Sequence, residues 1–132
     1  MNTYDWYQAL EKPFFAPPSS VFGVTWGIIY PLIAIAFIIL LFEVYNTKKI
    51  PKELVGVFVL NMIGNFMFTP VQFGLQSNIL AFFVICYVLL TLYIFEKKIA
   101  KYSKVIFYLM FPYLIWTSFA ALLQLTITIM NL

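Results

Sequence analysis

Two long stretches without a charged residue dominate this chain, residues 54–95 and residues 105–132. Each is longer than the roughly 20 apolar residues that a helix needs to cross a bilayer. The whole chain of 132 residues is 64% hydrophobic and only 10% charged. A water-soluble domain of this size has too much surface to hide so many apolar side chains. The sequence therefore predicts an all-α integral membrane protein.

Breaks in the apolar pattern divide this single membrane domain, residues 1–132, into four spanning helices. We expect the helices at about residues 21–45, 53–73, 79–95 and 105–130. Residues 1–18 are too polar and too rich in proline to span, and Pro13, Pro17 and Pro18 favour an extended backbone. The prediction is a bundle of four transmembrane helices with an N-terminal proline-rich lid at about residues 1–18.

The lysines predict how the bundle lies in the membrane. The formal net charge is +3, and all the lysines except Lys12 fall in or beside two loops that a four-helix bundle puts on one side. These are Lys48, Lys49, Lys52, Lys97, Lys98, Lys101 and Lys104. Positively charged loops stay in the cytoplasm, so we expect both loops there and both termini on the opposite side. No aromatic residues alternate with the lysines on a polar surface, so no nucleic-acid partner is expected.

Residues for metal binding or acid–base catalysis are missing from the sequence. The chain has no histidine, one cysteine (Cys86) and five carboxylates at expected helix ends and loops. No metal site, catalytic triad or bound cofactor is expected. Residues 96–104 are interpreted as the second lysine loop, which leaves no ionisable residue near the middle of a span. Small multidrug transporters, an alternative for a chain with four spans, need such a residue.

Polar residues form a stripe on one face of the second expected helix. Asn61, Asn65, Thr69 and Gln72 follow one another at spacings of four, four and three. Unpaired amides are costly in hydrocarbon, so the stripe should face the bundle interior. It could form hydrogen bonds between helices, or it could be the floor of a pocket that orients a polar group on an apolar ligand. Pro70 would bend the helix there, which favours the pocket.

Aromatic residues on the first and last helices could form the other walls of such a pocket. Trp26 and Tyr30 are four residues apart, and Trp116 and Ala120 share one face of the last helix. Tryptophan in membrane proteins usually lies at the lipid–water interface, but Trp116 is well inside its expected span. A buried indole N–H needs a partner, and the amide stripe could supply it.

Three motifs stand out in the sequence. The first is WYxxLxKPxxxPP followed by Trp and Tyr, within residues 6–30. The second is NFMFTP at residues 65–70, and the third is PYLIW with FA at residues 112–120. In these motifs the sequence resembles the translocator protein family, also called the tryptophan-rich sensory protein or TspO/MBR family. The motifs occur in the family's order and cover most of the chain.

The resemblance implies a lidded pocket for porphyrins, sterol-like lipids or synthetic apolar ligands. Carried over by position, the ligand-binding residues would be Tyr7, Pro17, Trp26, Tyr30, Asn65, Phe68, Gln72, Trp116 and Ala120. Bacterial members are associated with light-dependent breakdown of protoporphyrin IX, which implies catalytic roles for Trp26 and Trp116. The expected function is tetrapyrrole binding by a sensor or scavenger, with porphyrin as ligand or substrate. The resemblance also implies a homodimer in the lipid bilayer.

The sequence also departs from the family pattern. The family has five spans, one of them before the WY motif, whereas we expect four here, without that first helix. Phe15, Ser20 and Phe68 stand where the family often has tryptophan, and Gln124 replaces an asparagine. A structural or interaction role, with a lipid-filled pocket, is therefore a further alternative.

Overall fold

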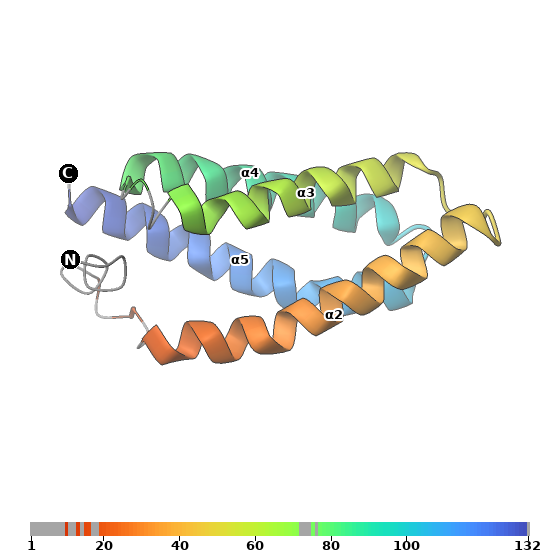
Figure 1. Ribbon diagram of the computed structural model, residues 1–132, viewed down its shortest axis with the longest axis horizontal. Helices are drawn as coiled ribbons and strands as arrows, with labels where there is room; N and C mark the ends of the chain where they lie inside the picture. The colour runs from red at the N-terminus through yellow and green to blue at the C-terminus, as the bar shows by residue number, and fades with distance from the viewer. Residues whose placement is uncertain are drawn as a thin grey trace.

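The computed structural model describes residues 10, 13, 15, 16, 19–71, 75 and 77–131. Within them the chain folds into an elongated bundle of four α-helices without a strand (Figure 1). The helices are α2 (Ser19–Tyr45), α3 (Glu53–Thr69), α4 (Asn78–Ile99) and α5 (Lys104–Met130).

Three of these helices, α2, α4 and α5, are long and apolar enough to cross a membrane. Their 27, 22 and 27 residues extend over about 40, 33 and 40 Å, against about 30 Å for the hydrocarbon core of a bilayer. Helix α3 is shorter, with 17 residues over about 25 Å, and Pro70 and Val71 continue it in a wide turn. The predicted all-α membrane fold is confirmed.

Serine side chains cap the N-termini of two of the helices. Ser77 Oγ accepts a hydrogen bond of 3.2 Å from the backbone N–H of Leu80 at the start of α4. Ser103 Oγ accepts one of the same length from Ile106 at the start of α5. Both serines have extended backbone angles, as N-caps do, so their hydroxyls satisfy amides that the first helical turn leaves without a partner.

The end of α4 differs from the sequence-based expectation of a loop over residues 96–104. Residues 96–99 form the last helical turn, and the connection to α5 is correspondingly shorter. Glutamate and lysine are good helix formers, and Ile99 is fully buried, so both propensity and packing extend the helix. Glu96 therefore lies in a helix and not in a loop.

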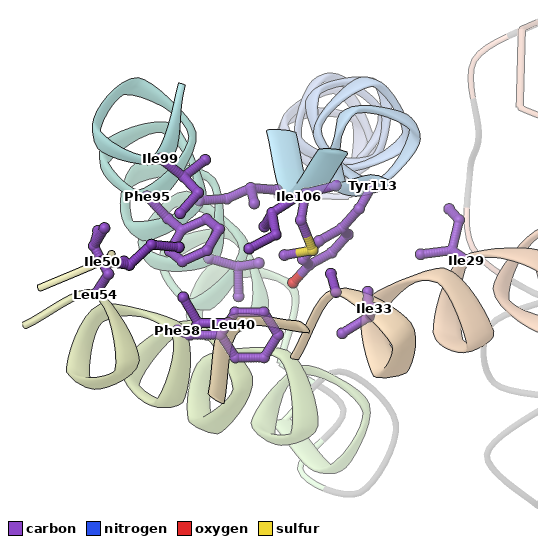
Figure 2. Packing of buried hydrophobic residues seen from close by; sticks show 14 of the residues in the cluster. Ile29, Ile33, Leu40, Ile50, Leu54, Phe58, Phe95, Ile99, Ile106 and Tyr113 are labelled. Carbon is purple, nitrogen blue, oxygen red and sulfur yellow. The ribbon is translucent and has the colours of Figure 1, made fainter. Parts of the chain in front are cut away.

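Both lysine-rich connections lie at one end of the bundle, and the start of α2 and the end of α5 lie at the other (Figure 1). Ile50, between α2 and α3, is 3% exposed and packs with Leu54 beside Phe95 and Ile99 of α4 (Figure 2). This apolar packing holds the α2–α3 connection against the end of α4. Which side of the membrane they face stays a prediction.

The main core joins all four helices through branched aliphatic and aromatic side chains (Figure 2). At its centre the Phe58 ring stacks on Phe37 at a centroid distance of 4.8 Å and meets the edge of Phe95 at 5.4 Å. Helices α3 and α4 are in close contact at Gly64, where an added Cβ would collide with the Tyr87 ring. Such close packing suits a membrane bundle, in which small residues let helices approach each other.

Helix α2 packs mainly against α5 and little against α3. The two helices run antiparallel (Figure 1), so the first half of α2 faces the middle of α5. This arrangement brings Trp26 next to Trp116, two residues that are far apart in the sequence.

Candidate functional site

Aromatic rings from α2 and α5 form the candidate site, here called the aromatic cluster: Phe22, Trp26, Tyr30, Tyr113, Trp116 and Phe119. On α2, Trp26 stacks on Tyr30 with centroids 4.9 Å apart and planes 24° apart. Trp26 meets Trp116 of α5 edge to face, at 6.4 Å and 90°. Stacked and perpendicular rings at such distances attract each other through their quadrupoles. The two tryptophans predicted to be catalytic are therefore direct neighbours.

The cluster extends along both helices from this pair. Phe22 lies one turn before Trp26 and contacts the edge of Trp116 at 5.6 Å. Phe119 lies 5.6 Å from Trp116, and Tyr113 contacts Trp26 at 6.2 Å. None of these three was among the predicted ligand-binding residues, although Tyr113 and Phe119 belong to the third motif. Spacings of three or four residues on a helix put all three on the faces of the two tryptophans.

A chain of hydrogen bonds ties the cluster to the amide stripe of α3. Tyr30 Oη donates to Asn65 Oδ1 at 2.9 Å, and Asn65 Nδ2 donates to Tyr113 Oη at 2.8 Å. Tyr113 Oη in turn donates to Asn61 Oδ1 at 2.9 Å. Both asparagines are buried, at 7% and 1% exposed, so their amides depend on these partners.

The chain of hydrogen bonds continues into α4. Asn61 Nδ2 donates to the carbonyl oxygen of Val88 at 2.9 Å and to Thr91 Oγ1 at 3.0 Å. All four helices are thus linked by one polar network, which runs from Tyr30 on α2 to Thr91 on α4. The stripe was expected either to form hydrogen bonds between helices or to be the floor of a pocket. The contacts of Asn61 and Asn65 are hydrogen bonds between helices.

Of the remaining predicted ligand-binding residues, two lie in the described part of the chain and three do not. Phe68 and Ala120 are partly buried and pack against the main core. Tyr7, Pro17 and Gln72 lie outside the described residues. A ligand contact by any predicted residue, including Asn65, stays a prediction.

The N-terminal segment contacts α5 beside the cluster, as far as it is described. Leu10, Phe15 and Ala16 pack with Phe22 and Phe119 on the buried surface around Leu123 and Ile127. The Phe15 and Phe119 rings meet edge to face at 6.3 Å. A turn with a 3.0 Å hydrogen bond from Ala16 N–H to the Pro13 carbonyl oxygen shapes the segment. The described lid residues therefore lie against the aromatic cluster.

A hollow of about 340 Å³ lies between α2 and α5 next to the cluster. It is lined by Thr25, Ile28, Ile29, Pro112, Ile115 and Trp116. Its volume is at the lower end of the range for small-molecule pockets, about 300–1,000 Å³. Trp116 thus takes part in both the cluster and the wall of the hollow.

The indole N–H of Trp116 is buried and has no hydrogen-bond partner. The expected partner, the amide stripe, instead binds the hydroxyls of Tyr30 and Tyr113. A buried donor without an acceptor costs about 1–3 kcal/mol. An acceptor atom on a ligand could remove this cost, so the site has one polar group available to orient an apolar molecule.

Chemically, the cluster offers stacking surfaces, one free donor and electron-rich indoles. Among the residues described, no group of three His, Cys, Asp or Glu side chains could hold a metal ion. Of the described carboxylates, none belongs to the cluster or lines the hollow. The described part of the site therefore offers aromatic rings and one indole N–H to a ligand.

Comparison with known proteins agrees with the motifs. The sequence matches the TspO/MBR family model over residues 1–130. It is 34% identical to the tryptophan-rich protein TspO of Bacillus cereus, covering 96% of this chain and 80% of that protein. Identity is 33% to the uncharacterized membrane protein YtaB of Bacillus subtilis (97% and 81% covered) and 30% to protein CrtK of Rhodobacter capsulatus (96% and 78%). With a family match over nearly its whole length and apolar helices that can cross a bilayer, this multi-pass integral membrane protein belongs to the TspO/MBR family.

Proposed function

We propose that the protein binds a porphyrin at the aromatic cluster and mediates its light-dependent oxidative breakdown, as a scavenger or sensor of tetrapyrroles. The observation that carries this proposal is the perpendicular pair of Trp26 and Trp116, 6.4 Å apart, beside an apolar hollow. A flat, apolar macrocycle is well matched to such indole surfaces, because stacking needs only an exposed π face.

The proposed chemistry uses tryptophan as an electron donor. A photoexcited porphyrin stacked on an indole can take one electron from it, which leaves a porphyrin anion radical and a tryptophan cation radical. The oxidation of the macrocycle that follows uses dissolved dioxygen as its oxidant. Trp26 and Trp116 adjoin each other, and Trp26 also stacks on Tyr30, so the positive charge could be shared among neighbouring rings. This step needs no titratable side chain, which suits a chain without histidine and a cluster to which none of the described carboxylates belongs.

The free indole N–H of Trp116 supports the same site. This buried donor has no partner, and a polar group on the macrocycle could accept its hydrogen bond. By contrast, Asn65 already donates to Tyr113 and accepts from Tyr30. We therefore assign orientation of the ligand to Trp116, and support of the Tyr30 ring to Asn65.

The test is titration of the purified protein with protoporphyrin IX, followed by tryptophan fluorescence and then by illumination. We expect quenching at micromolar porphyrin and bleaching of the porphyrin absorbance in light. Trp26→Phe and Trp116→Phe should each slow bleaching at least tenfold. The matched control is Tyr93→Phe on the outer face of α4, where the side chain is 57% exposed.

Two results would overturn different parts of the proposal. Absence of tryptophan quenching at micromolar porphyrin would refute porphyrin binding at the aromatic cluster. Binding that survives both tryptophan substitutions, together with an unchanged bleaching rate, would show that Trp26 and Trp116 are not the electron donors in the bleaching.

We also propose that the lysine-rich end faces the cytoplasm and that the protein is a homodimer. The first follows from the gathering of the lysines at one end of the bundle, and the second from the family resemblance. Labelling of single cysteines placed at Lys49 or Lys101, in a Cys86→Ala background, with a membrane-impermeant maleimide checks the sidedness. Crosslinking in native membranes checks the dimer, and only monomer would contradict it.

A further inference from the structure

One buried carboxyl group lies outside the aromatic cluster. Glu96, in the last turn of α4, is 2% exposed, whereas its neighbours Lys97 and Lys98 are exposed. Both carboxyl oxygens are shielded from solvent, and neither has a hydrogen-bond partner. The Glu96 carboxyl group has no role in the proposed porphyrin chemistry.

The surroundings of Glu96 on α4 are apolar. Leu92 and Ile99, one turn before and after it, are fully buried, and Phe95 is 1% exposed. Ile50 and Leu54 pack onto Phe95 and Ile99 from the α2–α3 connection and the start of α3 (Figure 2). Glu96 therefore occupies a core position in a helix that is apolar enough to cross the membrane.

Among the described residues, no cation compensates a charge at this position. Every described lysine is exposed, and within the described chain none comes close enough to Glu96 to form an ion pair. These lysines are Lys48, Lys49 and Lys52 around the α2–α3 connection, Lys97, Lys98 and Lys101 around the α4–α5 connection, and Lys104 at the start of α5. The other described carboxylates at this end are Glu43, partly buried near the end of α2, and Glu53, exposed in the first turn of α3.

An ionised carboxylate would be strongly disfavoured here. Burial removes the hydration of the carboxylate, and no hydrogen bond or ion pair replaces it. The C-terminal turn of a helix also carries partial negative charge, which repels an anion. A neutral carboxylic acid avoids both penalties.

We propose that Glu96 is a proton-binding site, a neutral carboxylic acid held inside the bundle at its lysine-rich end. It lies at the opposite end of the bundle from the start of α2, where the aromatic cluster begins. Loss of the proton would create an anion that is unstable in the apolar core. The exposed lysines at this end of the bundle would attract that anion towards the surface. The site is therefore built to hold one proton as long as α3, α4 and the α2–α3 connection stay packed.

Infrared spectroscopy of the protein without porphyrin, in lipid nanodiscs at neutral pH, tests the proposal. A protonated carboxyl has a carbonyl stretching band separate from that of carboxylates. We expect such a band in the wild-type protein, its loss in Glu96→Gln, and its retention in the control variants Glu43→Gln and Glu53→Gln. No acid band in the wild-type protein, or a band that survives Glu96→Gln, would overturn the proposal.

Chemical labelling gives a second readout that needs no variant. Dicyclohexylcarbodiimide enters membranes and adds to protonated carboxyls. The acid proton moves to a carbodiimide nitrogen, the carboxyl oxygen bonds to the central carbon, and the acyl group then migrates to nitrogen, so nothing leaves. Peptide mapping by mass spectrometry should find the adduct on Glu96 and not on Glu53. The reverse pattern would contradict the proposal.

The two sites can be told apart by cross-checks. Glu96→Gln should bind and bleach protoporphyrin IX like the wild-type protein, because it leaves the aromatic cluster intact. Trp116→Phe should keep the Glu96 acid band. Failure of porphyrin binding would therefore not affect the proton site, and a missing acid band would not affect the porphyrin site.

Discussion

Removal of one hydroxyl group, in Tyr113→Phe, tests how much the polar network stabilises the bundle. The Tyr113 hydroxyl accepts from Asn65 Nδ2 at 2.8 Å and donates to Asn61 Oδ1 at 2.9 Å, and the side chain is 1% exposed. Phenylalanine keeps the ring and its 6.2 Å contact with Trp26. The substitution therefore removes two hydrogen bonds and little packing.

The expected decrease in the free energy of unfolding has a lower and an upper estimate. Hydrogen bonds between membrane helices contribute about 0.6 kcal/mol on average, so two of them contribute about 1.2 kcal/mol. The variant also leaves an amide N–H and an amide oxygen buried without this partner, and a buried orphan costs about 1–3 kcal/mol. Some relaxation of the two asparagines offsets part of that cost. We expect the free energy of unfolding to fall by about 1–3 kcal/mol.

The assay is reversible unfolding by sodium dodecyl sulfate in mixed micelles, followed by circular dichroism. The matched control is Tyr108→Phe on the same helix, since the Tyr108 side chain is 66% exposed. That control should change stability by less than about 0.5 kcal/mol. Equal effects of the two substitutions would refute the view that the network holds the helices together. A double-mutant cycle with Asn65→Ala should further show coupling between Asn65 and Tyr113.

Three further substitutions test packing and capping by the same unfolding assay. Gly64→Ala should destabilise the protein by about 1–3 kcal/mol, because the new methyl group collides with the Tyr87 ring. Gly56→Ala has open space around its Cβ and should be neutral or stabilising by up to about 1 kcal/mol, so similar losses in both variants would contradict this. Ser103→Ala removes the cap on the Ile106 amide and should cost about 0.5–2 kcal/mol. An unchanged unfolding midpoint would show that water replaces the Ser103 hydroxyl.

The helical membrane fold could be predicted from the sequence because its determinants are local. Uncharged runs longer than a bilayer require helices, since every backbone group must find its partner within its own segment. The start of α4 at Asn78 and of α5 at Lys104 each lies one residue from the expected position, next to capping serines. The end of α4 could not be placed as well, because the burial of Ile99 depends on residues from the α2–α3 connection.

The candidate site was predictable only in part. The pairing of Trp26 with Tyr30 follows from their spacing on one helix, and the motifs pointed to Trp116. The partners of the asparagines did not follow, because a stripe of amides shows only that partners are needed. Which hydroxyls meet Asn61 and Asn65 depends on the positions of α2 and α5.

The sequence by itself thus determined a helical membrane protein, with family motifs that single out Trp26 and Trp116. Tertiary structure alone decided that these two indoles meet edge to face, that the Trp116 N–H has no partner, and that Glu96 is buried. The physical reason is the range of the interactions. Hydropathy and helix periodicity act between near neighbours in the chain, whereas ring contacts, hydrogen bonds and burial depend on how whole helices pack.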